Sequence, residues 1–292
     1  MKAQAYLLHT RPQSYPVTFF AAFTGYAISP AKPETAGGLA LDLGLLLLLF
    51  SVLLWGGTNA FNSSQDGNDG PLTLLPEPPP VPRFLNSFGL LLMLLAVLLA
   101  GLVSTRLLLW TAVGLLLSVW YSWKNPYFRR GKDIPVMDML INTVGFGFCS
   151  ILFGYFLTNA PLTPELLFIG IGFTFAYLGG MPTSQIFQLK EKTERNYTSL
   201  FGPATILKMG AVFFVLHLAF LAVFSADIVF LQANMLALAC WLGWGILVLA
   251  SAVHSFWWSK EPYTNPYNRM NRQMVMMMLS QVLWTSYAWM RS

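Results

Sequence analysis

The distribution of charge along the chain constrains its fold more than any other feature. About nine apolar stretches follow one another from end to end, and charged residues gather in every second gap between them. All but three of the 17 basic residues lie in that set of gaps or in the N-terminal tail. The exceptions are Lys32, Arg106 and Arg291. Because basic loops stay on the cytoplasmic side of a membrane, the asymmetry predicts a polytopic membrane protein with a cytoplasmic N-terminus.

Composition supports the same fold class. Of the 292 residues, 55% are hydrophobic and only 10% are charged, whereas a soluble domain carries about 25% charged residues. We expect an all-α bundle of about nine transmembrane helices in a single domain over 1–292, because helices satisfy their own backbone groups in lipid. The expected spans are 15–30, 39–58, 85–103, 105–123, 137–159, 164–182, 207–225, 228–251 and 271–290. An odd number of spans places the C-terminus outside the cytoplasm of a multi-pass protein of the cell membrane.

Two classes of function are excluded. The net charge of +5 is dispersed over loops as membrane orientation requires, so we expect no nucleic-acid partner. Cys149 and Cys240 both fall in apolar spans, which predicts neither a disulfide framework nor a metal site built on cysteine.

A polar cluster follows the second span directly. Asn59, Asn62, Asp66 and Asp69 are spaced three, four and three residues apart. If the helix continues, all four side chains lie on one face. Oxygen ligands at the membrane edge suit Mg²⁺, which binds one or two carboxylates together with substrate phosphates. The alternative interpretation is a water-exposed Gly/Asn/Asp turn.

Basic residues dominate the loop after the fourth span. Lys124, Arg129, Arg130 and Lys132 suit a diphosphate, because guanidinium and ammonium groups pair with phosphate oxygens. Plain membrane topology also explains them. Asp138 lies at the start of an apolar span, where an ionisable group faces a cavity or a partner, and we expect one of these cations to be its partner.

A mixed cluster follows the sixth span. Gln188, Glu191 and Arg195 share one helical face. Mixed charges of this kind are also typical of a solvated loop.

Taken together, these residues resemble the UbiA superfamily of intramembrane prenyltransferases, which are nine-helix bundles with two acidic motifs. The segment from Asn59 to Gly70 resembles the first motif in a variant seen in a bacterial branch. The stretch around Pro182, Gln185 and Glu191 resembles the second motif. The resemblance covers essentially the whole chain.

The motifs depart from the usual family pattern. Ala60 and Ser63 stand where the first motif has acids, and Lys192 and Tyr197 stand where the second has them. Fewer carboxylates neutralise a second Mg²⁺ less well, so a single metal, another diphosphate geometry and a loss of activity all stay open.

The resemblance implies prenyl transfer from a polyprenyl diphosphate to a lipophilic acceptor, with Mg²⁺ as cofactor and membrane lipids around the protein. It assigns Asp66, Asp69 and Glu191 to the metal, and Asp138 or Glu191 to the proton released by the acceptor. Tyr121, Phe61 and Phe187 are expected to shield the allylic cation. We expect no obligate protein partner. The residues expected to hold the diphosphate are Asn59, Asn62, Lys124, Arg129, Arg130, Lys132, Gln188 and Arg195.

Two other functions remain open. An intramembrane terpene cyclase would use the same diphosphate but direct the cation to its own chain. A non-catalytic lipid-binding or transport protein would use the basic face for anionic head groups, although the paired, interrupted helices of inverted-repeat transporters are missing from the sequence pattern.

Overall fold

The computed structural model describes residues 2–67, 72, 75, 77–188 and 197–292. Within these ranges the chain is helical and contains no strand. The longer elements are α2 (Tyr15–Ala27), α3 (Ala36–Leu46), η2 (Leu47–Trp55), α4 (Gly56–Asp66), α5 (Leu85–Val103), α6 (Thr105–Ser122), α7 (Pro135–Val144), α9 (Pro164–Gly180), α11 (Pro203–Ser225), α13 (Met235–Trp258) and α14 (Pro266–Arg291). The shorter elements are α1 (Lys2–His9), η1 (Pro12–Ser14), η3 (Gly131–Asp133), η4 (Gly145–Cys149), α8 (Ser150–Leu157), η5 (Met181–Gln188), α10 (Tyr197–Phe201) and α12 (Ile228–Ala233).

All nine predicted spans are helical, and the expected polytopic bundle is confirmed. In the described part of the chain, seven helical segments are long and apolar enough to cross a membrane. One of them, Ala36–Asp66, runs without a break through α3, the π-helical stretch η2 and α4. The first and last predicted spans fall outside this group. The helix α2 has only 13 residues, and α14 is less apolar than the other long helices because Asn, Gln, Ser and Thr residues are spread along it.

One predicted boundary is wrong. The expected span 228–251 is divided between α12 and α13. The side chains of Asp227 and Asn234 each accept a hydrogen bond from a backbone N–H of the following turn, at 3.0 Å in both cases. Two N-caps in succession start two separate helices. The spanning helix α13 therefore begins at Met235.

Small residues let the helices approach closely. An added Cβ at Gly25 of α2 would lie 1.8 Å from the carbonyl oxygen of Ile151, and one at Gly154 would lie 1.8 Å from that of Ala22. The two glycines thus form a reciprocal contact between α2 and α8, which is how helices pack tightly in lipid. This contact holds the short helix α2 inside the bundle.

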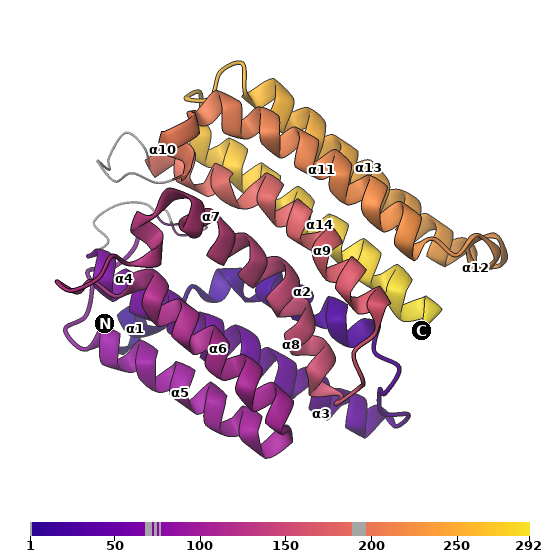
Figure 1. The fold of residues 1–292 in the computed structure, drawn as a ribbon, viewed down its shortest axis with the longest axis horizontal. Coiled ribbons are helices and arrows are strands. Elements are labelled where there is room, and N and C mark those ends of the chain that lie inside the picture. The colour runs from indigo at the N-terminus through magenta and orange to yellow at the C-terminus, as the bar shows by residue number, and fades with distance from the viewer. Residues whose placement is uncertain (1, 68–71, 73–74, 76, 189–196) are drawn as a thin grey trace.

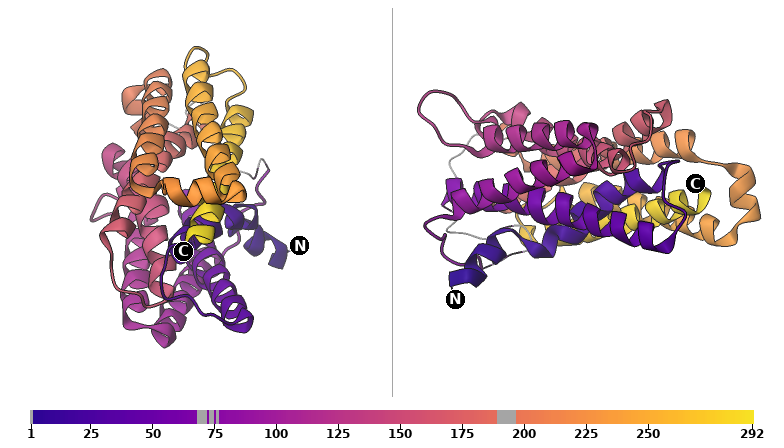
Figure 2. Two further views of the ribbon diagram at one scale, coloured as in Figure 1. Left: turned by 90° about the vertical axis from the view of Figure 1, so that its right-hand side faces the viewer. Right: turned by 90° about the horizontal axis from the view of Figure 1, so that it is seen from below.

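The helices run roughly along one axis, as two further views show (Figure 2). The end of α4, the start of α7 and α10 lie at one end of the bundle, whereas α12 and the C-terminus lie at the other (Figure 1). The expected acidic and basic clusters therefore meet at a single end.

Candidate active site

A cavity of about 260 Å³ opens at this end and continues into the bundle. Its lining is polar near the loops and apolar deeper inside. The polar lining residues include Arg11, Asn59, Asn62, Asp66, Tyr121, Lys132, Asp138, Asn142 and Gln185. The deeper lining residues include Phe50, Leu54, Trp110, Phe153 and Met277. Such a cavity suits a molecule with a charged head and an apolar tail.

The helix α4 brings three predicted residues to one face. Asn59, Asn62 and Asp66 all line the cavity, as their spacing predicts. The helix ends directly after Asp66, because Gly67 adopts a left-handed conformation with φ 64° and donates its N–H to the carbonyl of Ser63. Asp69 lies outside the described residues.

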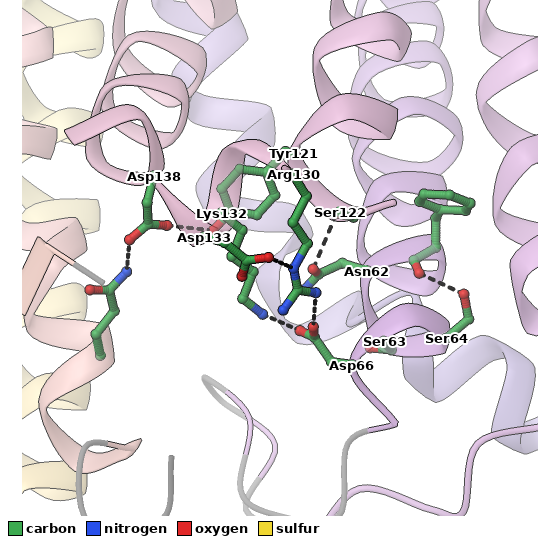
Figure 3. A network of polar contacts seen from close by, with 12 residues as sticks. Asn62, Ser63, Ser64, Asp66, Tyr121, Ser122, Arg130, Lys132, Asp133 and Asp138 are labelled. Atoms are coloured by element: carbon green, nitrogen blue, oxygen red, sulfur yellow. Dashed lines mark hydrogen bonds and ion pairs between the residues drawn. The ribbon is translucent and has the colours of Figure 1, made fainter. Parts of the chain in front are cut away.

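The carboxylate of Asp66 is held by two cations. One of its oxygens accepts a hydrogen bond from Nη1 of Arg130 at 2.9 Å, and the other accepts one from Nζ of Lys132 (Figure 3). The side chains of Asp66 and Arg130 are each 5% exposed. Arg130 also donates to Asp133 at 2.7 Å. Burial lowers the pKa of Arg130, but its contacts with Asp133 and Asp66 raise it more, so the guanidinium remains charged.

A third cation reaches the same place and was not among the predicted site residues. Arg11 lines the cavity and donates from Nη2 to Oγ of Ser63 at 3.5 Å. Its Nε is buried and has no hydrogen-bond partner within the described residues. Burial lowers the pKa of Arg11, and the charge of Asp66 opposes that effect.

The backbone of Arg11 is also unusual. It is left-handed, with φ 56° and ψ 61°, a conformation that costs a side-chain-bearing residue about 1 kcal/mol. The sequence offers little signal for this site, because an arginine before the first span looks like any other topology-setting charge.

The hydrogen-bond donors to the Asp138 side chain are neutral. It is fully buried, and its Oδ1 accepts a hydrogen bond from the hydroxyl of Tyr121 at 2.8 Å (Figure 3). Asn142 donates to the same hydroxyl at 2.9 Å, and Gln185 donates to Oδ2 of Asp138. Of the four loop cations, Lys132 interacts with Asp138 through its charge, and none of the four donates a hydrogen bond to it in the described part of the chain. The network fixes the Tyr121 hydroxyl at the cavity wall.

The remaining predicted residues lie elsewhere. The side chains of Lys124 and Arg129 are exposed and do not line the cavity. Phe61 is packed in the core, 3% exposed, away from the cavity lining. The backbone of Gln188 belongs to η5, but its side chain lies outside the described part of the chain, as do those of Phe187, Glu191 and Arg195.

The polar end of the cavity has the donor chemistry of a hard-cation site. Carboxylate and amide oxygens of Asp66, Asn59 and Asn62 are the ligand type that Mg²⁺ accepts. Among the described residues, however, no three His, Cys, Asp or Glu side chains lie close enough to share a metal ion. The Asp66 carboxylate also forms ion pairs with Arg130 and Lys132.

No protein-family model and no curated protein sequence matches the chain. Its fold does match solved structures. A UbiA homologue from Archaeoglobus fulgidus in complex with GPP and Mg²⁺ has a TM-score of 0.67 at 15% identity, over 98% of each chain. The same homologue with DMAPP and Mg²⁺ has a TM-score of 0.65 at 14% identity, also over 98% of each chain.

A further match is a structure described for digeranylgeranylglyceryl phosphate synthase, with a TM-score of 0.65 at 15% identity over 99% of each chain. The similarity covers every spanning helix and both ends of the bundle. The chain therefore shares its fold with these solved UbiA homologues.

Proposed function

We propose that the protein is an intramembrane prenyltransferase that moves a prenyl group from a polyprenyl diphosphate to a lipophilic acceptor. In this proposal the whole chain, 1–292, is one catalytic domain. The observation that carries it is the pair of cations Arg11 and Lys132 in the polar part of a cavity whose deeper lining is apolar, with Arg130 beside them on the Asp66 carboxylate. The solved structures with GPP and DMAPP support the choice of a prenyl diphosphate as the ligand.

The three cations have a defined role in this reaction. As the carbon–oxygen bond breaks, negative charge develops on the leaving diphosphate. Fixed positive groups beside the apolar cavity stabilise that charge more strongly than water does, because they are already oriented. Arg11 lines the cavity, so its guanidinium can donate hydrogen bonds to a phosphate oxygen bound there.

We include Mg²⁺ in the proposal, with Asp66, Asp69 and Glu191 as its carboxylate ligands and Asn59 and Asn62 as neighbouring amides. Bound there, the ion would neutralise diphosphate oxygens. Gln188 and Arg195 remain proposed diphosphate contacts. Lys124 and Arg129 are left out of the contact set, because their side chains are exposed.

The proton released by the acceptor needs a base. Asp138 is proposed for this role through Tyr121, whose hydroxyl donates to the Asp138 carboxylate at 2.8 Å and lines the cavity. The tyrosine would accept the proton from the acceptor as it passes its own to Asp138. Apolar side chains deeper in the cavity exclude water, which would otherwise capture the allylic cation.

The test is the release of inorganic diphosphate by the purified protein. Prenyl diphosphates from geranyl to longer polyprenyl chains would be supplied with and without Mg²⁺, and with and without a membrane lipid extract. Release that depends on both additions supports prenyl transfer. Release without extract, with a cyclic hydrocarbon formed from the ionised chain by ring closure and loss of one proton, supports a cyclase instead. Tight binding without release would refute the enzymatic proposal.

A further inference from the structure

Three aromatic side chains form a row across the cavity at mid-depth. Trp55 of η2 stacks on Phe146 of η4 with ring centroids 4.0 Å apart and planes inclined by 20°. Phe146 in turn stacks on Tyr177 of α9 at 5.8 Å and 26°. All three side chains line the cavity. We call them the aromatic row.

The row lies well below the polar mouth. Along the continuous helix, Trp55 is 11 positions before Asp66, about 16 Å at 1.5 Å per residue. Phe146 is eight positions beyond Asp138, about 12 Å along its own helix. The row is therefore too deep to shield a cation that forms beside the diphosphate. It lies instead where the later units of an isoprenoid chain would pass.

The cavity continues beyond the row. Phe50, Trp110, Cys149 and Phe153 line it further along the same helices and on α6. Phe153 is seven positions past Phe146, about 10 Å deeper. Phe50 and Phe153 meet at 4.7 Å between ring centroids. The row thus separates a polar mouth from a deep apolar section.

We infer that the aromatic row sets the length of isoprenoid chain that the protein binds, an inference that rests on the proposed function. A chain short enough to end at the row fits between it and the mouth. A longer chain has to pass beside the row to enter the deep section, and a ring has to move wherever that passage is narrower than the chain. Displacing a stacked ring in a packed interior is unfavourable.

The structure anchors the row at the Tyr177 end. The Tyr177 hydroxyl donates to Oε1 of Gln281 at 2.9 Å, and Nε2 of Gln281 donates to Oγ1 of Thr24 at 3.2 Å. These bonds join α9, α14 and α2. Gln281 is therefore a positioning residue that keeps the Tyr177 ring in the row.

A glycine beside the row leaves space that a substitution can fill. A Cβ added to Gly145 would meet only the Trp55 ring, at 4.0 Å, which is ordinary van der Waals contact. Gly145 also lines the cavity. A larger side chain there would narrow the passage at the row, whereas removing the Phe146 ring would widen it.

The chain offers a matched control. Phe148 belongs to the same π-helical stretch as Phe146 but packs against Gly170 of α9 and does not line the cavity. Phe146→Ala and Phe148→Ala remove the same ring from the same segment. A general loss of packing affects both variants, whereas a chain-length effect belongs to Phe146→Ala alone.

The experiment measures dissociation constants for unreactive thio-diphosphates carrying geranyl, farnesyl, geranylgeranyl and longer chains. We expect wild-type affinity to rise with length up to a limit and then to fall. Phe146→Ala should move that limit to longer chains and tighten binding of the next longer analogue by about tenfold. Gly145→Leu should move it to shorter chains. Phe148→Ala should keep the wild-type limit. Tyr177→Phe, which loses the hydrogen bond to Gln281, should make the affinity change less sharply with chain length at the limit.

The same series of isoprenoid alcohols separates this inference from the proposed function. The alcohols lack the diphosphate, so their ranking reports the fit of the hydrocarbon alone. If diphosphate release fails but the length limit persists and moves in Phe146→Ala, the prenyl-transfer proposal is refuted and this inference stands. An unchanged limit in Phe146→Ala, an equal shift in Phe148→Ala, or no binding of either series overturns it.

Discussion

The group of cations around Asp66 makes a quantitative prediction. Asp66→Asn keeps the shape of the side chain but removes its charge. In the wild-type protein both carboxylate oxygens accept hydrogen bonds from cations, and the Asp66 and Lys132 side chains are only 5% and 14% exposed. The substitution therefore removes the counter-charge that two poorly solvated cations share, and of the two Arg130 keeps its ion pair with Asp133.

The magnitude follows from this burial. Breaking a buried ion pair by removing one partner costs about 3–5 kcal/mol. The asparagine oxygen still accepts one of the two hydrogen bonds, so we expect the lower end, a loss of about 3 kcal/mol in the free energy of unfolding. An exposed pair provides the control. Arg269 and Glu261 lie 3.6 Å apart with Glu261 66% exposed, and Glu261→Gln should change stability by less than about 1 kcal/mol.

Unfolding titrations in mixed detergent micelles would measure both variants. The double variant Asp66→Asn with Lys132→Gln should lose less than the sum of the single losses, because the second substitution removes a cation that the first one stranded. Inorganic diphosphate without Mg²⁺ should bind Asp66→Asn at least as tightly as wild type, since one negative charge fewer stands among the cations. A stability equal to wild type, or strictly additive losses, would refute this reasoning.

Four further predictions follow from the described contacts. Arg11→Gln should weaken binding of inorganic diphosphate about tenfold, which corresponds to the roughly 1.5 kcal/mol of one charged hydrogen bond. Isothermal titration calorimetry measures this affinity, and an unchanged value would contradict the prediction. Gly154→Leu should prevent α2 from docking against α8, because the new Cβ would lie 1.8 Å from a carbonyl oxygen of α2. The control Gly37→Ala meets no atom within 4 Å and should fold normally. Size-exclusion chromatography in detergent should show a monodisperse peak for Gly37→Ala and not for Gly154→Leu. Burial lowers the pKa of His9 below its ordinary value, so the unfolded state binds the proton better than the folded state. The stability of the fold should therefore decrease as the pH drops below about 6.5. The rate of hydrogen exchange at the Thr10 amide should then rise in the wild-type protein but not in His9→Gln, whose side chain does not bind a proton. Reporters fused at residue 292 and within 77–82 should report opposite sides of the membrane, and the same side for both would contradict the nine-span topology.

Several features of the fold could be predicted because lipid leaves few alternatives. An apolar run in a bilayer has to form a helix, since no water is present to satisfy its backbone. The spans at 85–103 and 105–123 therefore agree with α5 and α6 to within a residue. The division at Asn234 was missed because the apolar pattern continues through it, whereas a local N-cap decides where α13 begins.

The candidate site was predictable only where one helix carries it. The period of an α-helix places Asn59, Asn62 and Asp66 on one face whatever surrounds them, and all three line the cavity. The loop after α6 has no such period. Its turn at Gly131–Asp133 directs Arg130 and Lys132 toward Asp66 and leaves Arg129 exposed, which no spacing rule distinguishes.

The sequence by itself determined the helical, membrane-spanning class of this protein and the end of the bundle where charge gathers. Tertiary structure alone decided which groups meet there and below. Arg11 approaches Ser63 across 52 positions of chain. Phe146 stacks on Trp55 and on Tyr177, and the three rings come from three separate helical segments. Such contacts depend on how helices pack in three dimensions, and a one-dimensional hydropathy pattern holds no information about which faces of distant helices come together.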